Sequence, residues 1–276
     1  MGFTLKDISD KLYFGMGDIS KEMSPIDAHD KLIVSASFLK RVYKENLHNV
    51  IMFPNHKVDS DLQKLFDIGS AFHCYVLEHN EFDKRYFVSD RIRPDDDRVR
   101  ISTVEFEFIE KSYENIAYKY PQMIDGLNCE MALFGEIDGV KVKCKMDKLN
   151  ITQSANGKFS HVEIVDLKSV YFNPFSLRKD PVNGRTKLRY MLSDIGYDLQ
   201  AYFYTLLVEN WLESIGQHCT VSFTLLTASK DNYEVQKFRV GSEMMESGRL
   251  KFESVWNDIR DFVLFGKDRL IDEEVL

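Results

Sequence analysis

The sequence predicts an α/β fold in which a central sheet is flanked by helices. Three observations predict it: apolar residues recur at helical spacing before residue 120, alternate with a period of two over residues 130–149, and return to helical spacing after residue 197. The chain has 276 residues, of which 44% are hydrophobic and 13% aromatic, so it can bury a substantial core. Because glycine and proline are scarce, no long linker is expected. We therefore expect an N-terminal extension over residues 1–30 and a single domain over residues 31–276.

The first part of the domain is predicted to be helical. Ser37 is expected to cap a helix that starts at Phe38, because its hydroxyl can accept a hydrogen bond from a free amide of the first turn. Residues 61–78 carry the strongest helical pattern. Arginine and aspartate residues around Pro94 predict an exposed loop over residues 88–99. A further helix is expected over residues 103–120.

Strands follow from residue 130 onward. The dipeptide Asp138-Gly139 tolerates positive φ and predicts a hairpin turn between strands at residues 130–137 and 140–149. In the second strand, apolar residues alternate with lysines and Asp147, which predicts one buried face and one polar face. Residues 162–168 are apolar on both faces, as is typical of a central strand. We expect a helix over residues 197–212, strands over 221–227 and 233–240, and an amphipathic helix over 244–265.

Charge and composition exclude several classes of protein. The formal net charge is −8, so any binding to DNA must be local or assisted by metal ions. Neither a signal peptide nor an apolar run of about 18 residues is present, so a cytoplasmic protein that does not enter membranes is expected. The four cysteines are widely separated, which predicts reduced thiols and no zinc or iron–sulfur site.

Asp166 and Lys168 are the first candidates for a catalytic site. They stand two residues apart on a predicted strand, so their side chains leave the same face. A carboxylate there can bind a hard divalent cation, and a lysine can stabilise the attacking water or a phosphate, as hydrolysis of a phosphodiester requires. The alternative for this pair alone is a surface salt bridge at the end of a strand.

Further ligands could converge on the same point. Asp147, 19 residues before Asp166, lies on the polar face of the neighbouring strand, where the alternative is a solvated carboxylate. Glu130 opens the hairpin and could also contact the metal, although Glu136 competes with it and an exposed edge charge is the simpler explanation. His73 lies on an apolar helix, where a histidine is more often a core residue than a ligand.

These residues resemble a known superfamily. Asp147, then the strand that carries Asp166 and Lys168, then a helix with Gln200 and Tyr204 are similar in order and spacing to the PD-(D/E)XK nuclease core with the Gln-x-x-x-Tyr motif of RecB-like and lambda-exonuclease-like nucleases. Residues 69–73 resemble the Gly-x-Ala-x-His segment of RecE-type phage exonucleases, and residues 35–37 resemble the segment that opens that domain. No Pro-Asp pair opens the motif here, but that signature is loose across the superfamily. The resemblance implies a PD-(D/E)XK restriction-endonuclease-like core with a central mixed sheet.

The resemblance also implies a role for each matching residue. Asp147 and Asp166 would ligate Mg²⁺, or Mn²⁺ in its place, with the main-chain carbonyl of Leu167 and His73 completing the shell. Lys168 would then serve the nucleophilic water.

Three further residues are carried over as part of the catalytic site. Glu130 would add a carboxylate, while Gln200 and Tyr204, one helical turn apart, would support the catalytic lysine or touch the scissile strand. An amphipathic core helix is the alternative for this pair, more plausibly for Tyr204 than for Gln200.

A basic segment is the best candidate for contact with DNA phosphates. Counterion release there would supply affinity that the acidic bulk of the protein cannot, although a solvated loop is the alternative. Its five basic residues are Arg178, Lys179, Arg185, Lys187 and Arg189.

With this resemblance, the residues imply an Mg²⁺-dependent DNA exonuclease that digests linear double-stranded DNA from its ends and leaves single-stranded overhangs for phage-type recombination. The 5′–3′ polarity, a homo-oligomeric ring of three or four subunits, a single-strand annealing recombinase as partner and a location in a bacterial host's cytoplasm follow only from the resemblance. One alternative is a structure-specific or restriction-type endonuclease on the same core, which would cut closed circular DNA. Another is a DNA-binding module without catalysis.

Overall fold

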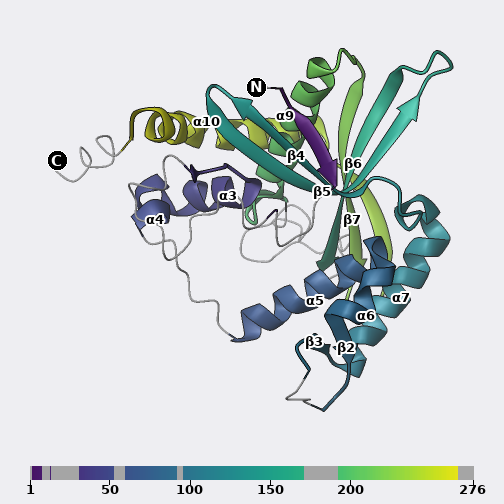
Figure 1. Ribbon diagram of the computed structural model, residues 1–276. Helices are drawn as coiled ribbons and strands as arrows, with labels where there is room; N and C mark the ends of the chain where they lie inside the picture. Colours follow the sequence, from purple (N-terminus) through teal and green to yellow (C-terminus); the bar gives the residue numbers. More distant parts are fainter. Residues whose placement is uncertain are drawn as a thin grey trace.

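A central sheet with helices on both faces organises the molecule (Figure 1). The computed structural model describes residues 2–7, 13, 31–52, 60–91, 96–170 and 192–266. Their helices are α3 (Ala36–Glu45), α4 (Leu47–Met52), α5 (Ser60–Leu77), α6 (Phe82–Arg85), α7 (Thr103–Lys119), α9 (Tyr197–Ser214) and α10 (Ser242–Phe265), with short 3₁₀ turns at His79–Glu81 and Pro121–Met123. Their strands are β1 (Thr4–Asp7), β2 (Tyr86–Val88), β3 (Val99–Ile101), β4 (Cys129–Ile137), β5 (Val140–Gln153), β6 (Phe159–Val170), β7 (Thr220–Ser229) and β8 (Val235–Arg239).

The described strands form a six-stranded sheet in the order β1-β4-β5-β6-β7-β8. All neighbouring pairs are antiparallel except β6 and β7, which run parallel and are joined through α9. The predicted α/β fold with a central mixed sheet flanked by helices is therefore confirmed. Within the described ranges, no helix is both long and apolar enough to cross a bilayer.

The two faces of the sheet carry separate hydrophobic cores. Figure 1 shows α3, α4, α9 and α10 gathered on one side and α5, α6 and α7 on the other. On β6, Ile164 belongs to the first core and the next residue, Val165, belongs to the second. Leu225 and Leu226 of β7 divide in the same way, because successive side chains of a strand point to opposite faces.

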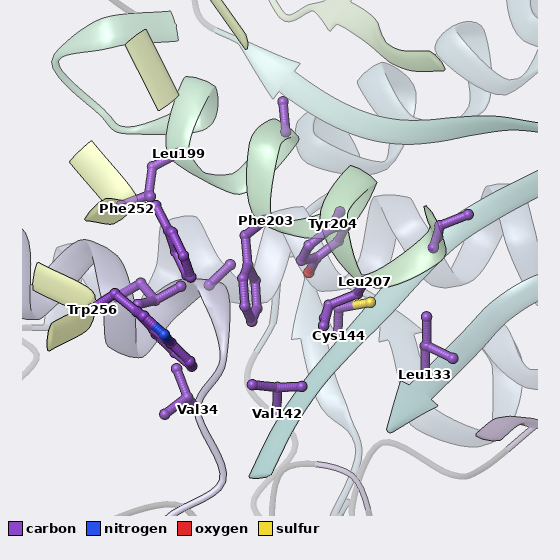
Figure 2. Close-up of a cluster of buried hydrophobic side chains, with 14 of the residues drawn as sticks. Val34, Leu133, Val142, Cys144, Leu199, Phe203, Tyr204, Leu207, Phe252 and Trp256 are labelled. Atoms are coloured by element: carbon purple, nitrogen blue, oxygen red, sulfur yellow. The ribbon is translucent and has the colours of Figure 1, made fainter. Parts of the chain in front are cut away.

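The first core holds α9 between the sheet and α10. Phe252 and Trp256 of α10 stack with ring centroids 4.8 Å apart, and Phe203 of α9 stacks on Phe252 at 6.1 Å. Figure 2 shows these rings in one cluster with Val142 and Cys144 of β5. All five side chains are buried, so α9 is fixed in position on the sheet.

Most predicted elements are present with small shifts of their ends. The helices predicted over residues 61–78 and 103–120 are α5 and α7, and α7 starts with a capping box between Ser102 and Glu105. Asp138 and Gly139 form the predicted hairpin turn with φ angles of 50° and 83°. Strand β5 continues to Gln153, beyond its predicted end at residue 149.

One local prediction was wrong and another needs only a shift of its ends. Ser35, not Ser37, caps α3: its backbone is extended and its hydroxyl accepts from the Phe38 amide at 3.4 Å, while Ser37 already lies in the first turn. The loop predicted over residues 88–99 lies between strands β2 and β3, which take only its end residues, Val88 and Val99, and pair in parallel. Tyr86 and Ile101 of these strands are buried in the second core and hold the two ends of the loop.

The predicted polar face of β5 was also wrong in part. Lys143 lies on that face but is only 1% exposed, because its Nζ donates to the carbonyl oxygen of Tyr13 at 2.8 Å. Strand β1, at the start of the predicted extension, pairs with β4 and brings Leu5 opposite Leu133. Residues before position 31 therefore complete one edge of the sheet and cover Lys143.

The sheet divides between β5 and β6. These strands pair from Gln153 opposite Phe159 up to Lys148 opposite Val165; beyond that point β5 continues beside β4 and β6 beside β7. Val34 forms an isolated bridge with Val142 on the open side of β5. The division exposes the end of the β5–β6 ladder, and Asp147, Asp166 and Lys168 lie just beyond it.

Candidate active site

A cavity of about 720 Å³ opens where β5 and β6 separate. Its lining comes from α3, α5, α6, β2, β4, β5, β6 and α9, so both faces of the sheet contribute. Every residue that the sequence proposed for catalysis lies on it, together with the predicted ligand His73. These are Glu130, Asp147, Asp166, Lys168, Gln200 and Tyr204. The structure thus brings together side chains that are up to 131 positions apart in the chain.

Asp147 stands at the point of division. Its Oδ2 accepts from the backbone amide of Leu167 at 2.6 Å, so a side chain takes the place of the next bond in the β5–β6 ladder. The same oxygen lies 3.4 Å from Nδ1 of His73 on α5. Burial would raise the pKa of Asp147, but the charges of His73 and Lys168 outweigh it and lower that pKa. Asp147 is therefore an anion held in a fixed orientation.

The protonation of His73 is set by Asp147. Burial alone would lower the pKa of His73, but the charge of Asp147 and its hydrogen bond raise it instead. The imidazole lies on α5 next to Phe72, whose ring meets it edge-on with centroids 6.2 Å apart. His73 therefore serves as a counter-ion to Asp147, through the nitrogen that a metal could take.

Glu130 completes a cluster of possible ligands. Each of His73, Glu130 and Asp147 offers one ligand atom, and these atoms all lie within 4.8 Å of one another. Burial and the charge of Asp147 raise the pKa of Glu130 to about 7, although an ion pair with Lys145 opposes this. Glu136, the competing candidate, stands opposite Lys141 in the hairpin and does not line the cavity.

Asp166 and Lys168 form a buried ion pair beside this cluster. Asp166 Oδ2 lies 2.6 Å from Lys168 Nζ, and Asp166 Oδ1 accepts from Nε2 of Gln200 at 2.7 Å. Burial is the main cause that raises the pKa of Asp166, whereas Lys168 opposes the rise. Burial would lower the pKa of Lys168, but the carboxylate of Asp166 raises it, so this lysine is a cation at neutral pH. Lys168 is thus suited to stabilise negative charge rather than to accept a proton.

The donor set fits a hard divalent cation. Two carboxylates and one imidazole within 4.8 Å of one another can bind Mg²⁺ or Mn²⁺, with open positions left for water and substrate. Asp166 Oδ2 is buried, and its contact within the described residues is the ion pair with Lys168, so this carboxylate oxygen keeps a second lone pair for a metal. The predicted contribution of the Leu167 carbonyl stays a prediction, because the described contact of Leu167 is made by its amide.

The helix α9 carries the Gln-x-x-x-Tyr pair. Gln200 is 6% exposed and Tyr204 9% exposed, and both border the cavity. Tyr204 also packs edge-on against Phe223 in the first core. It is therefore in part a core residue, which was the alternative that the sequence offered for it. Burial raises the pKa of Tyr204 well above its usual value, which keeps the phenol neutral.

Two residues near the site were missed by sequence reasoning. Tyr197 lines the cavity, with Lys168 Nζ 5.1 Å from its ring centroid. Lys40 of α3 donates from its Nζ to Oε1 of Gln200 at 3.2 Å. Helical spacing could have indicated Tyr197, which is one turn before Gln200, but nothing in the sequence links Lys40 to position 200.

The predicted DNA-contacting residues cannot be placed relative to this cavity. Arg178, Lys179, Arg185, Lys187 and Arg189 lie outside the described residues. Their role stays a prediction.

Comparison with known proteins agrees with this geometry. A profile of the family described as a PDDEXK-like domain of unknown function (DUF3799) matches residues 35–263. The chain belongs to this family. The PDDEXK-like domain therefore covers the chain from the start of α3 into α10 and includes every residue of the cavity except Tyr13.

One solved structure extends the comparison beyond the family. The PDDEXK-like domain is similar to the crystal structure of a presumed exonuclease from Eubacterium rectale, with a TM-score of 0.58 and 14% identity over 95% of this chain and 89% of that chain. At this identity the likeness concerns the fold. No curated protein matches the sequence.

Proposed function

We propose that this PDDEXK-like domain is a metal-dependent DNA nuclease. The observation that carries the proposal is the convergence of Asp147, Asp166 and Lys168 at the division of the sheet, with His73 and Glu130 within reach of the same ion. Carboxylates that hold a divalent cation beside a permanent ammonium are what hydrolysis of a phosphodiester requires. The name of the similar Eubacterium rectale protein supports the same class of reaction.

Each residue would have a distinct task. Glu130, Asp147 and Asp166, with His73, would hold Mg²⁺, which when bound polarises the phosphate and acidifies water. Lys168 stays protonated beside Asp166 and would neutralise charge that develops on the phosphate oxygens. Because only part of this charge exists in the substrate, Lys168 should contribute more to the rate than to DNA binding.

We further propose that the substrate is linear double-stranded DNA. One strand would be digested in the 5′–3′ direction, so that the product carries a single-stranded overhang. Support for these finer points is the resemblance of residues 69–73 and of the Gln200–Tyr204 pair to phage exonucleases. A role in recombination with an annealing partner, and a homo-oligomer of three or four subunits, belong to the same proposal. An endonuclease on the same core is the second candidate.

The test uses end-labelled linear duplex and closed circular duplex, each with Mg²⁺, Mn²⁺, Ca²⁺ or chelator. Linear DNA should be shortened with Mg²⁺ or Mn²⁺ and left intact with chelator. Ca²⁺ should permit binding with little turnover, because it is larger and coordinates more flexibly. Asp147→Asn, whose amide oxygen can still accept from Leu167, should lower the rate on the order of 100-fold or more while DNA binding persists.

The matched control is Asp231→Asn, an exposed carboxylate in the turn between β7 and β8. It should cleave like the wild type. Full activity of Asp147→Asn would refute the assignment of Asp147 to the active site. A wild type that cleaves neither DNA substrate with Mg²⁺ or Mn²⁺ would refute the proposed nuclease function. Cutting of the closed circle would select the endonuclease instead.

A further inference from the structure

Lys40 reaches the catalytic carboxylate through one intervening side chain. Its Nζ donates to Oε1 of Gln200 at 3.2 Å, and Nε2 of the same amide donates to Oδ1 of Asp166 at 2.7 Å. Three groups from three elements, α3, α9 and β6, thus form a chain that ends on Asp166. The two ends of this chain, Lys40 and Asp166, lie 126 positions apart in the sequence.

The chemistry of these groups fixes the direction of the chain. A glutamine amide has one accepting end and one donating end, and a carboxylate accepts only. An ammonium donates only, so the contact with Lys40 requires Oε1 to face α3 and leaves Nε2 to face Asp166. If the amide were reversed, two oxygens would oppose each other at Asp166 and two donors at Lys40. Lys40 therefore stabilises the one orientation of Gln200 that supports the carboxylate.

The fold makes room for this lysine. Gly196, at the start of α9, has φ of 86°, and a Cβ there would lie 3.1 Å from Cγ and Cδ of Lys40. The aliphatic part of Lys40 thus crosses the backbone just before α9. Its Nζ ends 5.3 Å from the ring centroid of Tyr197, close to the 5.1 Å of Lys168 Nζ. Two ammonium groups share one aromatic ring at the edge of the cavity.

The surroundings are unfavourable for a lysine that has no role. Lys168 and Asp166 face it from β6, Tyr197 and Gln200 from α9, and Lys44 from its own helix. Burial is the main cause that lowers the pKa of Lys40 to about 8, and the charge of Lys168 lowers it further. An apolar side chain would avoid both costs.

We propose that Lys40 is a positioning residue of the active site, which acts through Gln200 to hold the Asp166 carboxylate in its working orientation toward Lys168 and the bound cation. This inference rests on the proposed nuclease function. Lys40 does not itself touch the reacting groups, so its effect should depend entirely on Gln200.

A double-mutant cycle tests this dependence. Lys40→Met removes the donor and keeps the aliphatic length, and Gln200→Met removes the amide. With saturating Mg²⁺ and linear duplex, Lys40→Met should lower kcat about tenfold with KM for DNA changed less than about twofold. The double variant should be no slower than Gln200→Met alone, because the two residues act as a unit. Lys40→Arg keeps a donor and should restore most of the rate.

Controls separate this effect from a loss of folding. Lys44→Met, an exposed position one turn later on α3, should leave kcat unchanged, and all variants should unfold at temperatures close to the wild type. The proposal is overturned if Lys40→Met matches the wild type, or if its effect multiplies with that of Gln200→Met. Either result would mean that Lys40 does not act through the side-chain amide of Gln200.

An arm without catalysis keeps this inference distinct from the proposed function. The side-chain amide protons of Gln200 can be followed by NMR and assigned by their absence in Gln200→Met. In the wild type and Lys40→Arg they should exchange slowly and give one pair of signals; in Lys40→Met they should exchange faster. Should the wild type prove inactive on DNA, unchanged amide exchange in Lys40→Met would still refute the positioning role, and faster exchange would support it.

Discussion

Glu130 occupies a backbone conformation that residues other than glycine rarely adopt within a strand. Its φ is 54°, and such left-handed positions cost on the order of 1–3 kcal/mol unless the surroundings enforce them. Here the strained residue is a half-buried carboxylate that points at Asp147 and His73 and pairs with Lys145. Two negative charges are thus brought together at a local cost, which a bound cation would offset.

The raised pKa of Glu130, about 7, leads to a testable proton count. Below that pH the carboxyl is protonated and must lose its proton before it can bind a metal, so affinity should fall as pH falls below 7 and level off above it. Titration calorimetry in buffers of different ionisation enthalpy should show more protons released per Mn²⁺ near pH 6, where Glu130 and the imidazolium of His73 both give up a proton, than near pH 8. Glu130→Gln should lower the count near pH 6 by close to one and leave the contribution of His73.

Glu136→Gln is the matched control for this experiment, because Glu136 lies in the same hairpin but outside the cavity. It should release protons like the wild type. If Glu136→Gln changes the count and Glu130→Gln does not, the wrong carboxylate has been assigned to the ion.

At the scale of elements, α9 is the part on which the site depends most. It carries Tyr197, Gln200 and Tyr204, and it is held between the sheet and α10. The approach to α10 is close at Gly248, where a Cβ would lie 2.1 Å from the backbone oxygen of Asp198. Asp198 is itself fully buried and bonded to Ser247 and Lys251 of α10. The spacing of these two helices therefore controls the position of Gln200.

Gly248→Ala should accordingly destabilise the protein by at least about 2 kcal/mol, because the new methyl group meets backbone that cannot move aside. Thermal or chemical unfolding measures this. Gly69→Ala on α5 is the comparison: among the described residues, no atom outside its own stretch of helix lies within 4 Å of the added Cβ, so it should be neutral or stabilise by up to about 1 kcal/mol. Equal stability of the two variants would mean that α9 and α10 are not packed as described.

For the whole molecule, charge sets the conditions of DNA binding. The net charge of −8 repels a polyanion, and the cations of the cavity are already paired, Lys168 with Asp166 and Lys145 with Glu130. For the proposed nuclease, affinity for DNA would then come from bound metal and from a local basic surface. The segment that holds Arg185 and Arg189 is the sequence's candidate for that surface.

The double substitution Arg185→Ala and Arg189→Ala should weaken DNA binding and reduce the slope of log affinity against log salt by about 2, one for each lost phosphate contact. Cleavage at saturating DNA should be little changed, since neither residue is proposed to touch the reacting groups. Fluorescence anisotropy at several salt concentrations gives the slope. An unchanged salt slope would mean that Arg185 and Arg189 do not contact DNA phosphates and that this segment is ordinary solvated surface.

The sequence allowed the central part of the site to be predicted because it is local. Alternation along a strand puts Asp166 and Lys168 on one face, and a hairpin turn at Asp138 and Gly139 sets the adjacent strand that carries Asp147. The same reasoning failed for Lys143. Its place in the strand predicted exposure to solvent, but in the structure it is covered by the chain before residue 31. A strand's pattern shows which residues share a face, but not what another part of the chain lays over that face.

Two further features could not be predicted for the same reason. The sheet divides because β5 and β6 stop pairing with each other part-way along. Beyond that point β5 pairs only with β4 and β6 only with β7, so the position of the division depends on these outer strands. The contact of Lys40 with Gln200 joins residues 160 positions apart and needs the space left by Gly196. Only the packed fold brings these groups together.

The order of strands also bears on how the protein forms during synthesis. Strands β4, β5 and β6 follow one another directly, so their pairing closes only short loops and can precede the rest of the sheet. When residue 170 has left the ribosome, the nascent chain already holds Glu130, Asp147 and Asp166 but lacks α9. It thus has the carboxylates without Gln200, which arrives only with α9, the connection to β7. The growing polypeptide gains its full set of active-site groups only as its last third emerges.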